Sequence, residues 1–242
     1  MKCREIRHEL QRLSNHIGFP TGLNLSCPIF LQDKLSYIRS LPQHHVIPSY
    51  CVSLPLVTPL RDFEEVGLIS FLSNHSEGCG WVVKAPFTTN GEGVSFCKTK
   101  EDVLETLRRD QKKFAPRDIN YLIVQPCLEN AKEYKVVCLG GHPQYISKHS
   151  RSGKGSAFST RHEVMTFARK MLTIISENNQ SVIVNMLCRV DVMMYKDKLV
   201  VNEFESFEAL YSGPGDHEYI VTPFLIEFWK HKLMLAANEL LC

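Results

Sequence analysis

The sequence predicts an α+β fold, in which helices alternate irregularly with strands that pair as hairpins. One sign is a set of apolar runs of strand length joined by short turn signals such as Gly140-Gly141. A second is the presence of capping boxes, Thr99 with Asp102 and Thr160 with Glu163, in front of amphipathic segments. This irregular alternation favours mixed or antiparallel sheets over one parallel sheet.

The spacing of apolar residues predicts the elements of the N-terminal half. Residues 2–16 and 31–41 are expected to be helical, and 46–54 to form a strand. A helix over 61–73 is expected to bury one stripe of side chains: Phe63, Val66, Ile69 and Leu72. Two strands then flank a glycine loop, and a helix follows Thr99.

The C-terminal half is predicted in the same way. A buried strand begins at Tyr121, and strands over 133–139 and 144–148 form a hairpin. The helix that opens at Thr160 is expected to bury Val164, Phe167, Met171, Leu172 and Ile175. Residues 187–194 and 199–204 form another hairpin, and Thr222-Pro223 starts a last helix.

Composition excludes few classes of protein. The chain has 242 residues, 22% of them charged, and a net charge of +2. Nine cysteines without a C-x-x-C pair or zinc spacing suggest reduced thiols in a cytoplasmic protein. No apolar stretch approaches the roughly 20 residues of a membrane span, and no basic run with interleaved aromatic residues supports nucleic-acid binding.

The segment from Trp81 to Phe96 has the pattern of a phosphate-binding hairpin. Lys84 lies in an apolar run, the glycines Gly91 and Gly93 follow, and the chain then returns into a second apolar run. Glycines let backbone N–H groups approach an anion, and a lysine adds a positive charge. In a P-loop the glycines lead into a helix, with the lysine after them, so this segment predicts a β-hairpin flap. A solvated lysine beside a plain hairpin turn is the alternative.

A second chemical pattern is acidic. Residues two apart in a strand share a face, so Arg189 lies beside Asp191, and Glu203 beside Glu205. A three-residue turn, 196–198, would place Asp191 opposite Glu203 and Arg189 opposite Glu205. Converging carboxylates suit Mg²⁺. A two- or four-residue turn would weaken this hypothesis, and an exposed charge pair is the alternative.

Taken together and in order, these motifs resemble those of the ATP-grasp superfamily. The resemblance extends over residues 31–206 and rests on five segments: Leu31-Gln32-Asp33-Lys34 with Val46-Ile47-Pro48-Ser49, Trp81-Val82-Val83-Lys84-Ala85-Pro86 with Gly91 and Gly93, Val124-Gln125-Pro126-Cys127-Leu128, Glu133 and Lys135 before Gly140-Gly141, and Arg189-Val190-Asp191 with Val201-Asn202-Glu203-Phe204-Glu205.

The resemblance implies two α+β subdomains that hold ATP and magnesium (Mg²⁺) between their sheets. By this resemblance, the nucleotide is held by Lys34 and Lys84 at its phosphates, by Gln125, Cys127 and Leu128 at its adenine, and by Glu133 at its ribose. Mg²⁺ is bound by Asp191, Glu203 and Glu205, and the γ-phosphate or the acceptor is reached by Lys135 and Lys148. Charge on the transferred phosphoryl group is neutralised by Lys84, Lys135 and Arg189. The glycine flap would close over the phosphates.

Two features depart from the family pattern. The last metal ligand is often asparagine, whereas this chain has Glu205, with Asn202 as a fallback ligand. A Rossmann-like domain usually precedes the Asp-Lys helix, but only about thirty residues precede Asp33. The expected division is a short helical region over 1–25, a subdomain over 26–120 with the flap, and a subdomain over 121–242 with the acidic hairpin. A protein partner could supply the missing domain.

The resemblance implies an ATP-dependent ligase. A substrate carboxylate would attack the γ-phosphate to form an acylphosphate, and an amine or another nucleophile would displace phosphate. Two other hypotheses stay open: an ATP-grasp kinase that phosphorylates a hydroxyl, and a non-catalytic nucleotide-binding module within a complex.

Overall fold

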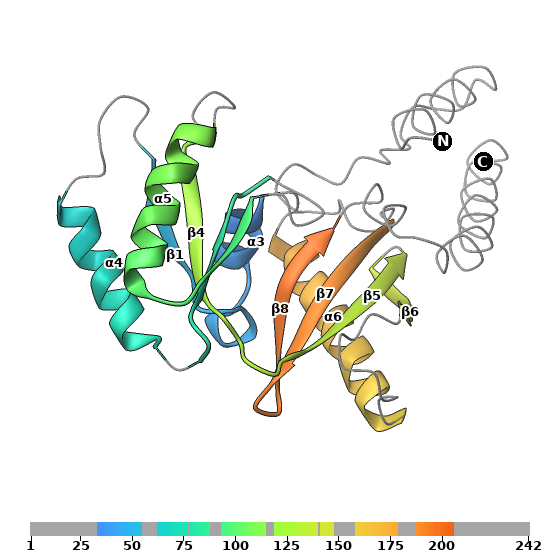
Figure 1. Cartoon of the computed structure of the whole chain (residues 1–242). Coiled ribbons are helices and arrows are strands. Elements are labelled where there is room, and N and C mark those ends of the chain that lie inside the picture. The colour runs from blue at the N-terminus through green and yellow to red at the C-terminus, as the bar shows by residue number, and fades with distance from the viewer. Residues whose placement is uncertain are drawn as a thin grey trace, which may run out of the picture.

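The computed structural model describes residues 33–54, 62–76, 78–87, 93–114, 119–139, 141–147, 158–178 and 187–205. These residues form two four-stranded antiparallel sheets, each with helices on one face, which lie side by side (Figure 1). The mixed α+β fold expected from the sequence is therefore confirmed. The expected helices over 2–16 and from Thr222 lie outside the described residues.

The first sheet has the strand order β1-β4-β2-β3. Its strands are β1 (Tyr50–Ser53), β2 (Trp81–Lys84), β3 (Val94–Cys97) and β4 (Tyr121–Pro126). The helices α4 (Asp62–Asn74) and α5 (Lys100–Phe114) pack against this sheet. A short helix, α3 (Lys34–Ser40), and a 3-10 turn, η1 (Gln43–His45), precede β1 and contact the second sheet instead.

The second sheet has the order β6-β5-β7-β8. Its strands are β5 (Lys132–Leu139), β6 (His142–Ser147), β7 (Leu187–Tyr195) and β8 (Lys198–Glu205). The long helix α6 (Phe158–Asn178) packs against β5, β6 and β7. Both hairpins predicted for this half are confirmed, because β5 pairs with β6 and β7 pairs with β8.

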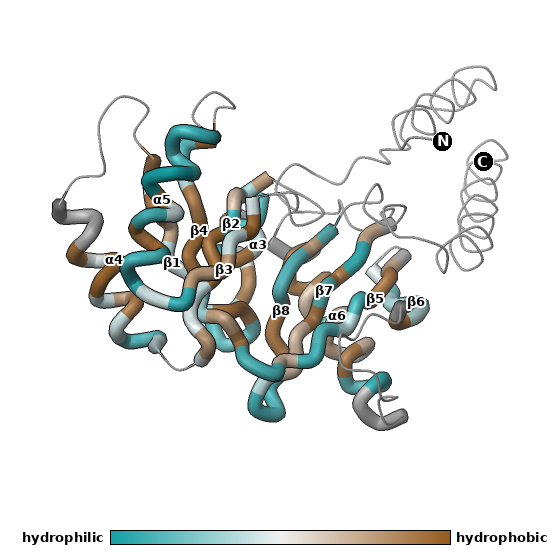
Figure 2. The backbone as a smooth tube through the Cα atoms, viewed as in Figure 1, coloured by the Kyte–Doolittle hydropathy of each residue, from teal (hydrophilic) through white to brown (hydrophobic). Residues whose placement is uncertain are grey.

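Alternation along the strands separates each core from the face that the two sheets turn toward each other. On β7, Cys188, Val190 and Val192 are fully buried in the core under α6. Residues between them carry charge, because neighbouring side chains of a strand point to opposite faces. In Figure 2, β4 is brown along most of its length, whereas β7 and β8 carry teal segments among the brown.

Two details of the helices differ from the sequence predictions. α6 begins at Phe158, so Thr160 lies inside the helix and not at its N-cap; its predicted core residues are all buried. On α4 the predicted face is wrong in part, because Leu68 and Leu72 are buried while Val66 is 68% exposed. α4 carries apolar residues on more than one side, so periodicity alone did not identify the buried face.

The sequence-based boundary at residue 120 is also wrong. β4 pairs with β1 and β2, so the first sheet extends to Pro126, and the chain crosses to the second sheet between Cys127 and Lys132. A largely apolar strand such as β4 carries no sign of which strands it pairs with. Among the described helices, none has both the length and the apolarity that a membrane span requires.

Candidate functional site

Lys84 is the point at which the first sheet reaches the second. Trp81 and Val83 are in the core beneath α4 and α5, so Val82 and Lys84 point to the opposite face of β2. The Lys84 Nζ atom donates a hydrogen bond to Asn202 Oδ1 on β8, at 2.9 Å. Burial lowers the pKa of the Lys84 ammonium, although Glu203 acts in the opposite direction.

Asn202 occupies a β-bulge in β8. From the turn, Tyr195 pairs with Lys198 and Val192 pairs with Val201, but the next pair is Asp191 with Glu203. Asn202 is therefore one extra residue in β8, and such bulges re-aim side chains locally.

The bulge explains a partly wrong prediction. The turn has two residues, Lys196 and Asp197, both with positive φ as in a type I′ turn, and not the expected three. A two-residue turn alone would have placed Asp191 opposite Asn202. The predicted pairings of Asp191 with Glu203 and of Arg189 with Glu205 are nevertheless confirmed, because the bulge shifts the register by one residue.

The Asn202 side chain bridges a cation and an anion. Its Oδ1 atom accepts from Lys84, and its Nδ2 atom donates to Glu133 Oε1 on β5, at 2.9 Å. The hydroxyl of Tyr37, a fully buried side chain of α3, donates to the Asn202 carbonyl oxygen at 2.9 Å. Four elements, α3, β2, β5 and β8, thus converge on this one asparagine.

The Asp33-Lys34 pair lies beside the same place. Asp33 caps α3, since its Oδ1 atom accepts from the Leu35 N–H at 3.0 Å. It also accepts a hydrogen bond from the Tyr121 hydroxyl of β4. Lys34 is 4% exposed, and its Nζ atom lies 2.6 Å from Glu203 Oε1. The cap therefore fixes the start of a helix whose first side chain enters the charged face of the second sheet.

Arg189 and Asp191 form the most buried ion pair of this face. Arg189 Nε donates to Asp191 Oδ1 at 2.6 Å, and Nη2 donates to Oδ2 at 2.9 Å. Glu205 Oε1 lies 3.8 Å from Arg189 Nη2, and Lys135 Nζ lies 3.9 Å from Asp191 Oδ2. Burial raises the pKa of Asp191 to about 6 and that of Glu205 to about 7. Burial therefore opposes ionisation of both carboxyls, whereas the neighbouring Arg189 favours it.

The carboxylates are paired with cations and are not gathered around one point. Within the described residues, no three His, Cys, Asp or Glu side chains are grouped so as to hold a metal ion. Glu203 faces Lys34, whereas Asp191 and Glu205 face Arg189. Oxygen donors of this kind are nonetheless those that Mg²⁺ prefers. The assignment of Asp191, Glu203 and Glu205 to a metal stays a prediction.

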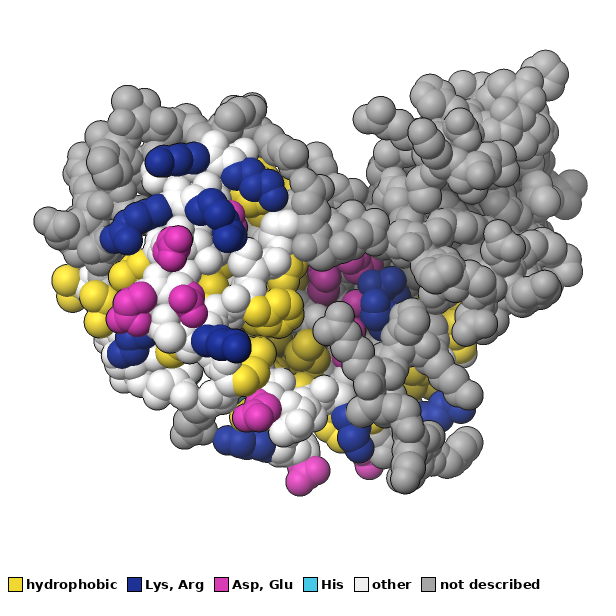
Figure 3. All heavy atoms as spheres, in the orientation of Figure 1, with side chains coloured by type: hydrophobic (Ala, Val, Ile, Leu, Met, Phe, Trp, Pro, Cys, Tyr) yellow, Lys and Arg dark blue, Asp and Glu magenta, His cyan; other side chains and the backbone are white. Residues whose placement is uncertain are grey.

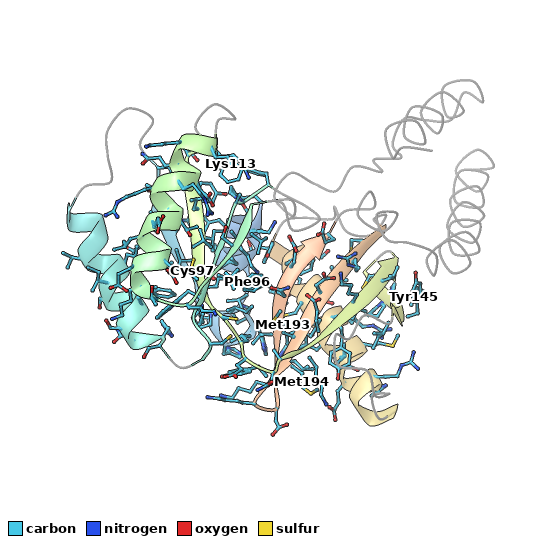
Figure 4. All side chains as sticks on the ribbon, in the orientation of Figure 1. Phe96, Cys97, Lys113, Tyr145, Met193 and Met194 are labelled. Atoms are coloured by element: carbon cyan, nitrogen blue, oxygen red, sulfur yellow. The ribbon has the colours of Figure 1, made fainter. Side chains whose placement is uncertain are left out.

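The two faces around this cluster differ in character. Acidic and basic side chains gather where the two halves of the molecule meet (Figure 3). On the first sheet, Phe96 pairs with Val82 in register and is 71% exposed. Phe96 on β3 and Met193 on β7 both lie in the middle of the molecule, where the two sheets approach each other (Figure 4).

The remaining predicted residues lie at or beyond the margin of this cluster. The Gln125 side chain is buried and donates from Nε2 to Ser49 Oγ at 2.8 Å, while no described atom pairs with its Oε1. The carbonyl of Leu128 accepts from Ala131 N, and the Cys127 sulfur faces Cys79. Gly93 has a φ of 67°, and its carbonyl accepts from Ala85 N at 2.9 Å. Gly91 and Lys148 lie outside the described residues.

Sequence reasoning missed the central position of Asn202 and the contribution of Tyr37. Asparagine is depleted in strands, so an asparagine amid the apolar residues of β8 was a sign of a bulge. Nothing in the sequence indicated that the Tyr37 hydroxyl would reach a strand 165 positions away.

Comparison with known proteins yields structural likeness alone. No protein-family model matches the sequence, and a search of curated proteins finds no match. The D-alanine–D-alanine ligase of Bacillus anthracis, complexed with ATP, is 13% identical with a TM-score of 0.58, over 87% of this chain and 68% of that one. The Helicobacter pylori D-alanine–D-alanine ligase is 15% identical with a TM-score of 0.53, over 80% of this chain.

A third likeness is to the biotin carboxylase domain of the Hydrogenobacter thermophilus 2-oxoglutarate carboxylase. It is 16% identical with a TM-score of 0.51, over 74% of this chain and 40% of that one. This chain spans 57% of the length of the Helicobacter ligase. The likeness to these solved structures shows that the chain, with its two antiparallel sheets, has the ATP-grasp fold.

Proposed function

We propose that this protein binds Mg-ATP between its two sheets and uses it to activate a substrate carboxylate for attack by an amine. The observation that carries the proposal is the contact of Lys84, from the first sheet, with Asn202 of the second, beside Glu133 and Glu203. A lysine of the first sheet thus lies beside carboxylates of the second, where a nucleoside triphosphate and its metal would both find partners.

The two lysines would bind the phosphates. Lys34 is buried and Lys84 half-buried, and burial lowers the pKa of Lys84 because the ammonium has lost water. A phosphate oxygen would restore the lost stabilisation. Glu133, which now accepts from Asn202, would accept from the ribose hydroxyls, while the backbone of residues 125–128 would contact adenine.

Asp191, Glu203 and Glu205 would hold Mg²⁺. When bound, the ion would neutralise negative charge on the phosphates during transfer. Glu203 would exchange Lys34 for the metal, and Lys34 would then be available to a phosphate. Arg189 and Lys135 lie beside Asp191 and would stabilise the charge that spreads over the transferred phosphoryl group.

The reaction class is supported by the neighbours of this fold. Two are named D-alanine–D-alanine ligases, one of them complexed with ATP. The carboxylase domain is a complex with MgADP and bicarbonate. By likeness, a carboxylate oxygen would attack the γ-phosphorus and release ADP, and an amine would then displace phosphate from the acylphosphate.

A chemical unfolding experiment with ATP, ADP and GTP, each with and without Mg²⁺, tests the binding step. ATP with Mg²⁺ at 100 times its Kd should raise the free energy of unfolding by about 2.7 kcal/mol. Lys84→Met should remove this increase, and Glu203→Gln should remove its dependence on Mg²⁺. Lys112→Met, at an exposed position of α5, is the matched control and should retain both. Equal responses of Lys84→Met and Lys112→Met would show that the site is elsewhere.

Turnover is tested separately. ADP release that requires both a carboxylate and an amine supports a ligase, whereas release that requires only an alcohol contradicts it. A panel of amino acids and hydroxy acids, with hydroxylamine to trap acylphosphates as hydroxamates, distinguishes the two outcomes.

A further inference from the structure

Two cysteines face each other at the point where the chain leaves the first sheet. Cys79 lies two residues before β2, and Cys127 is the first residue after β4. Their Sγ atoms are 2.8 Å apart. A disulfide requires 2.03–2.05 Å, so a shift of about 0.8 Å would suffice to join them.

The backbone around Cys79 fixes this approach. The Cys127 N–H donates to the Gly80 carbonyl at 2.8 Å, which continues the pairing of β2 with β4 beyond both strands. Gly78 and Gly80 have φ values of 145° and 121°, which other residues rarely adopt. A Cβ atom at Gly78 would lie 2.6 Å from the Cys127 carbonyl oxygen. The two glycines therefore allow the loop to press Cys79 against Cys127.

The two thiols differ in accessibility. Cys79 is exposed, whereas Cys127 is partly buried. Burial and the neighbouring Cys79 raise the pKa of the Cys127 thiol to about 12. A small disulfide in solution would therefore meet the Cys79 sulfur first.

A second cysteine pair provides an internal comparison. Cys138 on β5 and Cys188 on β7 are direct register partners, and both are completely buried. Reagents reach such thiols only when the protein opens. Proximity alone is thus common to both pairs, and accessibility distinguishes the first.

We propose that Cys79 and Cys127 form a reversible disulfide by exchange with a low-molecular-weight disulfide such as oxidised glutathione. The Cys79 thiolate attacks one sulfur of the reagent and releases one thiol. The Cys127 thiolate then attacks Cys79 in the mixed disulfide and releases the second thiol. The protein loses two hydrogens, and one reagent disulfide becomes two thiols.

The consequence lies in the connection between the two sheets. Cys127 begins the segment that crosses from β4 to β5, which Figure 1 shows at the lower side of the molecule. The bond would tie this segment to the loop 78–80, and so restrict movement of one sheet relative to the other. Cys127 also belongs to the segment proposed to contact adenine, but the exchange itself requires only the two thiols and the reagent.

Alkylation and mass spectrometry test the proposal. The native full-length protein is treated with oxidised glutathione, its free thiols are alkylated, and it is digested with trypsin. We expect one linked pair of peptides, 62–84 with 118–132. We also expect free Cys138 and Cys188, and loss of the link after dithiothreitol. Hydrogen exchange of residues 127–131 should be slower in the oxidised form.

Variants and contrary outcomes complete the test. Cys79→Ser should abolish the link and the change in hydrogen exchange, and Cys127→Ser should abolish the link independently if the first variant folds poorly. Recovery of both cysteines as separate alkylated peptides, or as glutathione adducts that never resolve into the link, would overturn the proposal. Equal oxidation of Cys138 with Cys188 would do the same, because it would indicate pairing in an unfolded chain.

Discussion

The facing sides of the two sheets have opposite characters. The first sheet presents Val82 and Phe96 around one cation, Lys84. The second presents a dense set of charges, in which Arg189 and Asp191 are 8% and 2% exposed. A buried charge is tolerated only with a partner. Substitutions on the facing side of the first sheet should therefore change stability little, whereas each charged residue on the facing side of the second sheet stabilises another.

The largest loss of stability should come from Arg189→Met, which removes the central cation from the charged face of the second sheet. Among the described residues it leaves Asp191 with Lys135, at 3.9 Å, as its ion-pair partner, and it removes the cation that lies 3.8 Å from Glu205. Loss of one partner of a buried ion pair costs about 3–5 kcal/mol. Urea unfolding measures this loss. Arg39→Met on the exposed side of α3 is the control and should change stability by less than about 0.5 kcal/mol. Similar values for both would contradict the comparison.

The next effect is a dependence of stability on pH. The pKa values of Asp191 and Glu205 are raised in the folded protein, to about 6 and about 7, so the folded state binds these protons more tightly than the unfolded chain. Stability of the metal-free protein should thus fall as pH rises from about 4 to above 7. Unfolding in the presence of a chelator measures this slope. Glu205→Gln should remove the part near pH 7, and an unchanged slope would show that Glu205 is not responsible.

A smaller loss of stability is expected at Asn202, which joins the two sheets through its hydrogen bond with Lys84. Asn202→Leu removes the acceptor for Lys84 and the donor for Glu133, which leaves two partly buried charged groups without these bonds. The expected cost is about 2 kcal/mol. A double-mutant cycle with Lys84→Met measures the coupling, which should be clearly non-zero. Strict additivity of the two changes would show that the hydrogen bond contributes nothing.

The smallest effect on folding should occur on the first side. Phe96 is 71% exposed, so Phe96→Ser should change the free energy of unfolding by less than about 0.5 kcal/mol. If the aromatic face contacts a nucleotide base, the stabilisation by Mg-ATP should fall by about 1 kcal/mol. Val66→Ser, at an exposed site of α4, should leave that stabilisation unchanged. A Phe96→Ser protein that responds to Mg-ATP as fully as the parent would place the base elsewhere.

Local rules predicted the elements well. The capping box at Thr99 is confirmed atom for atom: Asp102 N donates to Thr99 Oγ1 at 3.1 Å, and Thr99 N donates to Asp102 Oδ2 at 2.9 Å. Such motifs involve residues three apart, so their physics is contained in the sequence. The hairpin at Gly140-Gly141 was predictable for the same reason, and Gly141 has a φ of 76°.

The contacts between segments far apart in the sequence were harder to predict. The membership of β4 in the first sheet, the buried face of α4 and the contact between Tyr37 and Asn202 all depend on packing between distant segments. The meeting of Lys84 with the acidic hairpin was expected only from the family resemblance. The register of that hairpin was expected for a wrong reason, because a one-residue bulge leaves no unambiguous trace in the sequence.

The bulge has a consequence for how this hairpin could have been assembled. With residue 202 deleted, the two-residue turn alone would keep Val201 opposite Val192, Glu203 opposite Asp191 and Phe204 opposite Val190. The ladder would run unbroken, and every other side chain would keep its side. The asparagine is thus a separable addition to a hairpin that is already complete, and a chain one residue shorter would have the carboxylates without the amide that joins them to Lys84.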